Sequence, residues 1–239
     1  MAQTPFRTER GQRVAAVSAA QMRRVDDVAV SETGPQLLQM MENAGRNLAR
    51  NAMAARPGLR SVTVLAGPGG NGGGGLCAAR HLTNHGIDVT VVLDRDPDDL
   101  SGATATQWET LEAMDVQRTT DATAAVVEAD VVIDALLGYG LDGAPDDRIG
   151  EFVDIAAKAA YLVSLDVPSG VDATTGERPG VAVEPDRTLT LALPKTGLTD
   201  LDGPLYLGDI GIPAVVYEQV GIDYESPFEG EYVLPLVVE

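Results

Sequence analysis

Short apolar segments that alternate with helical segments constrain the fold of this chain more than any other feature of its sequence. The apolar segments are rich in Val, Leu and Ile, and each is about as long as a buried strand. They cover 61–66, 88–93, 130–134 and 161–166. Strands that alternate with helices form parallel sheets with both faces covered. The chain is therefore predicted to be a single-domain α/β protein with a Rossmann-like, doubly wound, mostly parallel sheet and helices on both faces, in three layers.

The predicted helices are marked by capping residues and by proline. Ser18 followed by Gln21 is a capping-box pattern, so a helix is expected from there to near Gly34. Pro35 can begin a second helix that ends before Pro57. Further helices are expected over 76–85, 101–114, 121–128 and 149–160, and further strands around 188–193 and 205–207.

The two ends of the chain are expected to be loosely ordered. Residues 1–13 are predicted to form a loose arm, and the tail after Tyr224 is expected to be loose as well. Between them the sequence shows no repeat and no domain boundary. A length of 239 residues suits one α/β domain, so 1–239 is predicted to be a single domain.

The charge balance limits the partners of this chain. Asp and Glu number 36 against 17 Lys and Arg, which gives a net charge of −19. Such a charge repels nucleic-acid phosphates and anionic membranes, so neither is expected as a partner. The acidic excess fits either simple solubility or adaptation to high salt, where screening weakens the self-repulsion. Of these two interpretations, we favour the halophilic one.

The lack of an apolar membrane or signal segment and the small number of Cys and His residues predict the cellular compartment and limit the possible metal sites. No apolar run approaches the ~20 residues that span a membrane, and residues 1–13 lack an apolar signal core, so a cytoplasmic protein is predicted. The single cysteine, Cys77, excludes an internal disulfide and is expected to be a small packed helix residue. His81 and His85 lie one helical turn apart, but no third zinc ligand is evident. They are expected to be exposed surface residues.

The segment from Gly67 to Gly75 follows the first predicted strand, and seven of its nine residues are glycine. Glycine permits positive φ and lets backbone amides approach an anion, which the positive end of the next helix also attracts. Gly67 to Gly72 matches G-x-G-x-x-G, with Asp94 at the distance of a ribose-binding acid, so an NAD-dependent dehydrogenase is one alternative. A merely flexible turn is another.

Two carboxylates end predicted strands at the edge where ligands of such sheets bind. Asp134 and Asp166 each follow an apolar strand, and either could cap backbone amides or act as a ligand. Because both carboxylates face one glycine loop, a metal site or a general acid–base pair explains them better than a structural role as caps of two turns. We therefore predict that Asn71, Asp134 and Asp166 meet at one rim of the sheet.

Six short motifs occur in the order in which the YjeF N-terminal domain family carries them. They are Met41-Glu-Asn-Ala-Gly45, the glycine segment, Asp134-Ala-Leu-Leu-Gly-Tyr-Gly140, Asp166-Val-Pro-Ser-Gly170, Pro194-Lys195 and Gly208-Asp-Ile-Gly-Ile-Pro213. Each motif alone is weak, but their shared order is specific. The chain therefore resembles this family from Ser18 to Pro213.

This resemblance implies an isomerase of nicotinamide nucleotide repair, an NAD(P)H-hydrate epimerase. Such an enzyme interconverts the R and S forms of NADH or NADPH hydrated at C6 of the nicotinamide ring. A separate ATP- or ADP-dependent dehydratase would act on the S product, and a homodimer is an expected assembly. The implied cofactor is a potassium ion held by Asn71, Asp134 and Ser169, and the implied acid–base catalyst is Asp166.

The implied substrate-binding residues lie on two loops and at one strand end. They are Gly70, Asn71, Gly72, Gly73, Gly74, Gly138, Tyr139, Gly140, Leu141, Asp142, Gly143, Ala144 and Asp166. The chain departs from the family within the first loop, which is usually G-P-G-N-N-G-G-D-G. Gly70 stands in place of the first Asn and Gly74 in place of the Asp, so two polar side chains are missing. Weak epimerase activity is expected, and the alternative is a non-catalytic nucleotide-binding or scaffold domain.

Overall fold

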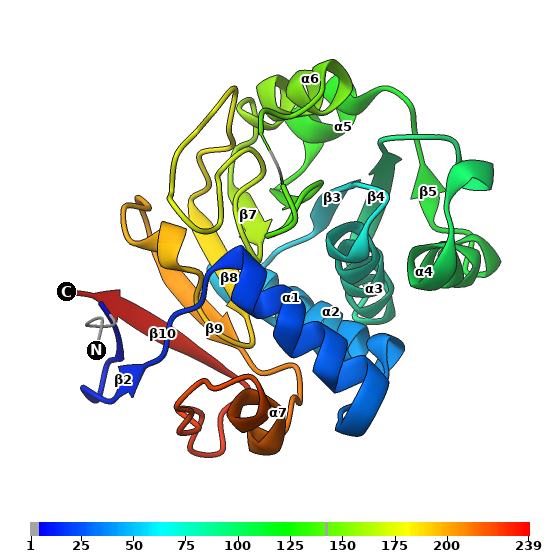
Figure 1. Cartoon of the computed structure of the whole chain (residues 1–239). Coiled ribbons are helices and arrows are strands. Elements are labelled where there is room, and N and C mark those ends of the chain that lie inside the picture. The colour runs from blue at the N-terminus through cyan, green and yellow to red at the C-terminus, as the bar shows by residue number, and fades with distance from the viewer. Residues whose placement is uncertain (1–4, 142) are drawn as a thin grey trace.

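A ten-stranded sheet runs through the computed structural model, which describes residues 5–141 and 143–239 (Figure 1). In spatial order its strands are β2 (Arg13–Val14), β1 (Phe6–Thr8), β10 (Val233–Val238), β9 (Leu205–Gly208), β8 (Arg187–Leu191), β7 (Leu162–Leu165), β6 (Val131–Ala135), β3 (Ser61–Ala66), β4 (Asp88–Leu93) and β5 (Gln117–Arg118). The seven strands from β9 to β5 are parallel, and β10, β1 and β2 add an antiparallel edge. The predicted doubly wound, mostly parallel sheet is confirmed.

Helices cover both faces of the sheet, as predicted (Figure 1). On one face lie α2 (Leu37–Ala55), α3 (Gly70–Asn84) and α4 (Gly102–Ala113), and on the other lie α5 (Ala122–Glu128) and α6 (Asp147–Ala156). Val64 and Leu65 are neighbours on β3 but belong to different apolar clusters, because successive strand residues point to opposite faces. Among the described residues, no helix is both long and apolar enough to cross a membrane.

A third apolar cluster joins α1 (Ala19–Val28) and α7 (Ala214–Gln219) to the antiparallel edge. The capping box that starts α1 is present: Ser18 Oγ accepts from the Gln21 amide at 3.2 Å, and Gln21 Oε1 accepts from the Ser18 amide at 2.9 Å. A π-helical turn, η1 (Ala29–Thr33), continues α1 up to Gly34, where the predicted helix ends. Short 3₁₀ turns occur at η2 (Pro97–Asp99) and η3 (Thr196–Leu198).

The expectation of loose chain ends is wrong for the segments that form β1, β2 and β10. Phe6 pairs with Val238 and Thr8 with Leu236, and Phe6 is completely buried. β1 and β2 have only three and two residues, too few to stand out in the sequence, and β10 carries Pro235, which argues against a strand. Together they satisfy one another's backbone hydrogen bonds and bury apolar side chains, so each end orders the other.

The glycine segment is also different from its prediction, because α3 begins at Gly70 and not at Leu76. None of the glycines from 67 to 75 has a positive φ, and from Gly70 onward they lie in the first turns of α3 rather than in an open loop. Instead they permit close packing. A Cβ on Gly73 would lie 2.5 Å from Met41 Cε, and a Cβ on Gly75 would lie 2.5 Å from Ala135 Cβ. The first turns of α3 can therefore press against α2 and β6.

Candidate active site

The sheet changes winding direction between β3 and β6, and a cavity opens at this point. From β3 the chain winds outward through β4 to β5, and then returns to place β6 on the opposite side of β3. Ala66 and Ala135 pair at the carboxyl ends of these two strands. Ligands of doubly wound sheets bind at such a position. The cavity has a volume of about 620 Å³, within the range of small-molecule sites.

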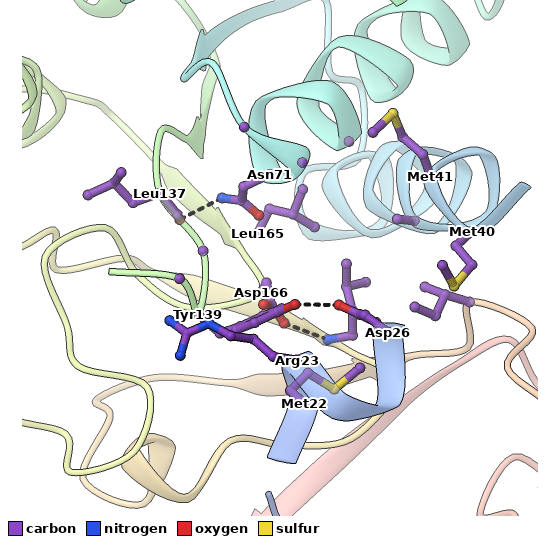
Figure 2. A pocket seen from close by; sticks show the side chains of 18 of the residues that line it. Met22, Arg23, Asp26, Met40, Met41, Asn71, Leu137, Tyr139, Leu165 and Asp166 are labelled. Atoms are coloured by element: carbon purple, nitrogen blue, oxygen red, sulfur yellow. Dashed lines mark hydrogen bonds between the residues drawn. The ribbon is translucent and has the colours of Figure 1, made fainter. Parts of the chain in front are cut away.

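The cavity has a largely apolar wall and a small set of polar groups. The apolar wall comes mainly from α1, α2 and the strand ends, and includes Met22, Leu37, Met40, Met41 and Leu165. The polar side chains come from several elements, and Figure 2 shows Arg23, Asp26, Tyr139 and Asp166 close together. The polar side chains are Arg23, Asp26, Asn71, Tyr139, Asp166 and Lys195.

Asp166 is held in an unusual backbone conformation beside a buried cation. It follows the end of β7 with φ = +67°, in the left-handed region that non-glycine residues seldom occupy. Its Oδ1 accepts from Lys195 Nζ, and from the Leu191 amide at 3.1 Å. Lys195 Nζ also donates to the Leu191 carbonyl at 2.9 Å. Strained residues of this kind cluster at functional sites, and here the strain aims a buried carboxylate into the cavity.

A second carboxyl group enters the same cavity from α1. Asp26 accepts a hydrogen bond from the Tyr139 hydroxyl (Figure 2). Burial raises the pKa of Asp26, and the hydrogen bond from Tyr139 lowers it by less. Burial also raises the pKa of Tyr139, with a further contribution from the Asp26 charge. The Tyr139 ring lies 5.7 Å from Lys195 Nζ, so the Asp26–Tyr139 pair is adjacent to the Asp166–Lys195 pair.

Asp134 lies behind the cavity wall, fully buried. Its carboxylate accepts from Ser164 Oγ at 2.8 Å, and from both the amide and the hydroxyl of Ser169. Ser169 Oγ accepts from the Leu137 amide at 2.9 Å, and Asn71 Nδ2 donates to the Leu137 carbonyl at 2.6 Å. Asn71, Asp134 and Ser169 are therefore linked through the backbone amide and carbonyl of one residue, Leu137. This chain of hydrogen bonds places them at the rim that carries Asp166, as the strand ends predicted.

The predicted substrate-binding residues divide into those that line the cavity and those that do not. Gly70, Asn71, Gly74, Gly138, Tyr139, Gly140, Leu141 and Asp166 line it. Gly72 and Gly73 lie inside α3, where a Cβ on Gly72 would lie 1.8 Å from the Gly67 carbonyl oxygen. Gly143 and Ala144 lie outside the cavity lining, and Asp142 falls outside the described residues.

Two functional candidates had little sequence signal. Lys195 is one of only two lysines and follows Pro194 in a family motif, but its burial and its partner were not predicted. Asp26 lies on an amphipathic helix next to Asp27, where an acidic residue is ordinarily exposed. Its role depends on Tyr139, which is 113 positions away in the sequence.

Other groups singled out in the sequence lie away from the cavity. Asp94 is bound by the neighbouring Arg95 at 2.9 Å and does not line the cavity, which weakens the dehydrogenase alternative. Cys77 is buried, as predicted, and burial together with the Glu42 charge raises its pKa to about 12. His85 is exposed, but His81 is largely covered and its Nε2 lies 2.9 Å from Glu42 Oε1.

Glu42, Cys77 and His81 bring three ligand atoms within 4.8 Å of one another, so Glu42 is a third donor that the sequence did not reveal. Arg80, however, donates to Glu42 and contacts Cys77 Sγ at 3.4 Å. The negative charge of the cluster is thus already compensated by a guanidinium group.

The fold and the cavity together define a doubly wound α/β protein with a buried acid–base pocket at the switch point of its sheet. Residues 37–197 match the family described as YjeF-related protein N-terminus, and the chain belongs to this family. It is 49% identical over 238 residues to the NAD(P)H-hydrate epimerase of Dehalogenimonas lykanthroporepellens, covering 97% of this chain and 96% of that protein.

More distant relatives agree with this assignment. The NAD(P)H-hydrate epimerase of Pirellula staleyi is 34% identical over 83% of this chain and 93% of its own length. The bifunctional NAD(P)H-hydrate repair enzyme Nnr of Hyperthermus butylicus is 46% identical over 82% of this chain, which spans 39% of that protein. The crystal structure of yeast ynu0 has the same fold, with a TM-score of 0.83 at 23% identity over 93% of this chain and 100% of the yeast chain.

Proposed function

We propose that this chain is an NAD(P)H-hydrate epimerase, an isomerase of nicotinamide nucleotide repair. The observation that carries the proposal is the Asp166–Lys195 pair inside a cavity of about 620 Å³, in a chain 49% identical to a relative with that name. The apolar wall suits a nicotinamide ring, and a few polar side chains line the same cavity, where they can reach the reacting carbon.

The chemistry centres on C6, which carries the hydroxyl group and is bonded to the ring nitrogen. Inversion can proceed by loss of water and re-addition from the other face, or by opening and closing of the ring. Both routes need a group that takes and returns a proton beside a site where charge develops. Asp166 supplies that group, and Lys195 fixes its position.

A potassium ion at Asn71, Asp134 and Ser169 is the second part of this proposal. Asp134 is completely buried, and among the described residues no Lys, Arg or His is paired with it. A buried carboxylate without a counter-charge is costly, and a monovalent cation would balance it. Carboxylate, hydroxyl and amide oxygens are the ligands that hard cations take. The ion would fix the Leu136–Leu137 backbone that borders the substrate.

The test is incubation of the purified protein with the R hydrate of NADH and of NADPH, followed by chromatographic separation of the two epimers. We expect S hydrate to form faster than in a blank without protein, and faster with potassium than with choline. Carrying out the reaction in ¹⁸O-labelled water distinguishes the routes, since loss and re-addition of water brings in one solvent oxygen per inversion, whereas ring closure returns the original oxygen except where the open-chain aldehyde hydrates first. A protein that binds the hydrate without turnover would instead be a binding or scaffold module, which the missing side chains at Gly70 and Gly74 favour.

The setting of the reaction completes the proposal. We place it in the cytoplasm, with a separate ATP- or ADP-dependent dehydratase consuming the S product. We also propose that the protein assembles as a homodimer. Sedimentation of the purified protein would measure it.

A further inference from the structure

We propose that Asp26, hydrogen-bonded to Tyr139, is a second acid–base group of this pocket and works with Asp166 on the two faces of the reacting carbon. The inference rests on the proposed epimerase function and assigns a role to a residue outside the family motifs. An epimerase that removes and re-adds water must serve both faces of one carbon. A single fixed carboxylate can face only one of them.

The two carboxyl groups enter the cavity from different layers of the protein. Asp166 stands at the end of β7 in the sheet, whereas Asp26 stands on α1, which covers the cavity (Figure 2). Tyr139 lies between them, with its hydroxyl on Asp26 and its ring 5.7 Å from the ammonium group that binds Asp166. Both carboxyl groups line the cavity, one from the sheet and one from the helix layer, and we infer that the reacting carbon binds where both can reach it, beside the Tyr139 ring.

The surroundings of the two groups suit opposite roles. Asp166 receives an ammonium donor and a backbone amide, as a carboxylate does. Asp26 receives a side-chain hydrogen bond from Tyr139, and burial raises its pKa. The ionisable groups that face it are Tyr139, Lys195, Asp166 and Tyr217 from other elements, and Arg23 and Asp27 on α1. Two neighbouring carboxyl groups with such different environments divide into an acid and a base.

The step balances with these two groups alone. The Asp26 carboxyl gives its proton to the C6 hydroxyl, and the C6–O bond breaks with its electron pair to release water. The lone pair of the ring nitrogen forms a double bond to C6. A water molecule then adds to C6 from the other face, the nitrogen regains its lone pair, and the proton of that water passes to the Asp166 carboxylate. Proton exchange with solvent, or the reverse reaction, restores the starting state.

Three variants test the inference against the natural protein. Asp26→Asn should fold and bind the hydrate but lose roughly 10²–10⁴-fold in kcat. Glu109→Gln, an exposed residue of α4 away from the cavity, is the control and should keep the natural rate. Tyr139→Phe removes a hydrogen bond that lowers the pKa of Asp26. Because the acid must be protonated, activity falls as the pH rises through that pKa, so this variant should retain activity to higher pH.

The outcomes separate this inference from the proposed function. If the natural protein does not epimerise the hydrate, the proposed function fails. If the natural protein is active and folded Asp26→Asn is equally active, the second acid–base group is refuted while the epimerase stands. If the Asp26→Asn variant does not fold, the pH profile of the Tyr139→Phe variant tests the inference instead. An unmoved basic limb in its kcat/KM profile would show that Tyr139 and Asp26 are structural.

Discussion

Lys195 donates from Nζ to Oδ1 of Asp166, and the two side chains are only 1% and 6% exposed. The same ammonium group donates to the carbonyl of Leu191, the last residue of β8, so it joins the ends of β7 and β8. Asp166 and Ala192 both have positive φ on either side of this contact. One ion pair thus holds two strained turns together and fixes the position of the candidate catalytic carboxylate.

Asp166→Asn should keep the fold and lose roughly 10²–10⁴-fold in epimerase activity, since a carboxamide cannot exchange the proton. Asparagine tolerates positive φ, so the turn should survive. Asp115→Asn is a control for the backbone, because Asp115 also has positive φ but is exposed on the surface. Turnover of the R hydrate and circular dichroism are the measurements. Unchanged turnover in Asp166→Asn would remove Asp166 from the mechanism.

Lys195→Met should lower the free energy of unfolding by about 3–5 kcal/mol, because it leaves the Asp166 charge buried without a partner. Denaturant unfolding measures the change. Combining it with Asp166→Asn should recover part of the loss, since the unpaired charge is then gone. The control is Lys158→Met, which alters the other lysine at an exposed position. Equal stability of the Lys195 and Lys158 variants would mean that the pair contributes nothing.

Restoring polar side chains at Gly70 and Gly74 should raise activity. One hydrogen bond to a charged group is worth roughly 1.5–3 kcal/mol, or about ten- to a hundredfold in rate. The two positions differ in available space: a Cβ on Gly70 meets no atom within 4 Å, whereas a Cβ on Gly74 lies 2.9 Å from Leu165 Cδ2. We therefore expect Gly70→Asn to be accepted directly and Gly74→Asp only after the Leu165 methyl group moves.

The rates of the single and double variants test this prediction. A natural protein as fast as relatives with Asn and Asp at these positions would show that the missing groups do not matter. A double variant without activity, in a protein that binds no dinucleotide, would indicate that the chain has left the epimerase function.

Gly75→Ala should destabilise the protein by about 1–3 kcal/mol, the usual range for overpacking. Its Cβ would lie 2.5 Å from Ala135 Cβ and force α3 away from β6. Gly70→Ala, at the first residue of the same helix, introduces a methyl group into open space and serves as the control for helix propensity. The melting temperatures of the two variants, each compared with the natural protein, should therefore shift in different directions or by clearly different amounts. A Gly75→Ala variant as stable as the natural protein would contradict the packing role of this glycine.

The acidic surface should make stability depend on salt. With a net charge of −19, self-repulsion weakens as ions screen it, so the melting temperature should rise from low to molar KCl. NaCl should act similarly on stability, whereas only potassium should activate turnover if the ion site is correct. A melting temperature that does not change with salt would refute the halophilic interpretation.

The sequence by itself determined the layered architecture and most of the pocket's location. Apolar runs such as Val131 to Ile133 indicate buried strands directly. Because the carboxyl ends of parallel strands meet at the same edge of the sheet, Asp134 and Asp166 are then predicted to lie at that edge. Ordered motifs also revealed the family. These features are local, or follow from how strands and helices must pack.

Only the tertiary structure decided which side chains meet inside the pocket and why the glycines are there. The Asp26–Tyr139 bond joins positions 113 residues apart, and the pairing of Phe6 with Val238 joins the two ends of the chain. Gly73 and Gly75 look like a flexible loop in the sequence, but Met41 and Ala135 occupy the space that their side chains would need. Contacts between distant segments leave no periodic signal in the sequence, because they depend on where the whole chain brings each residue.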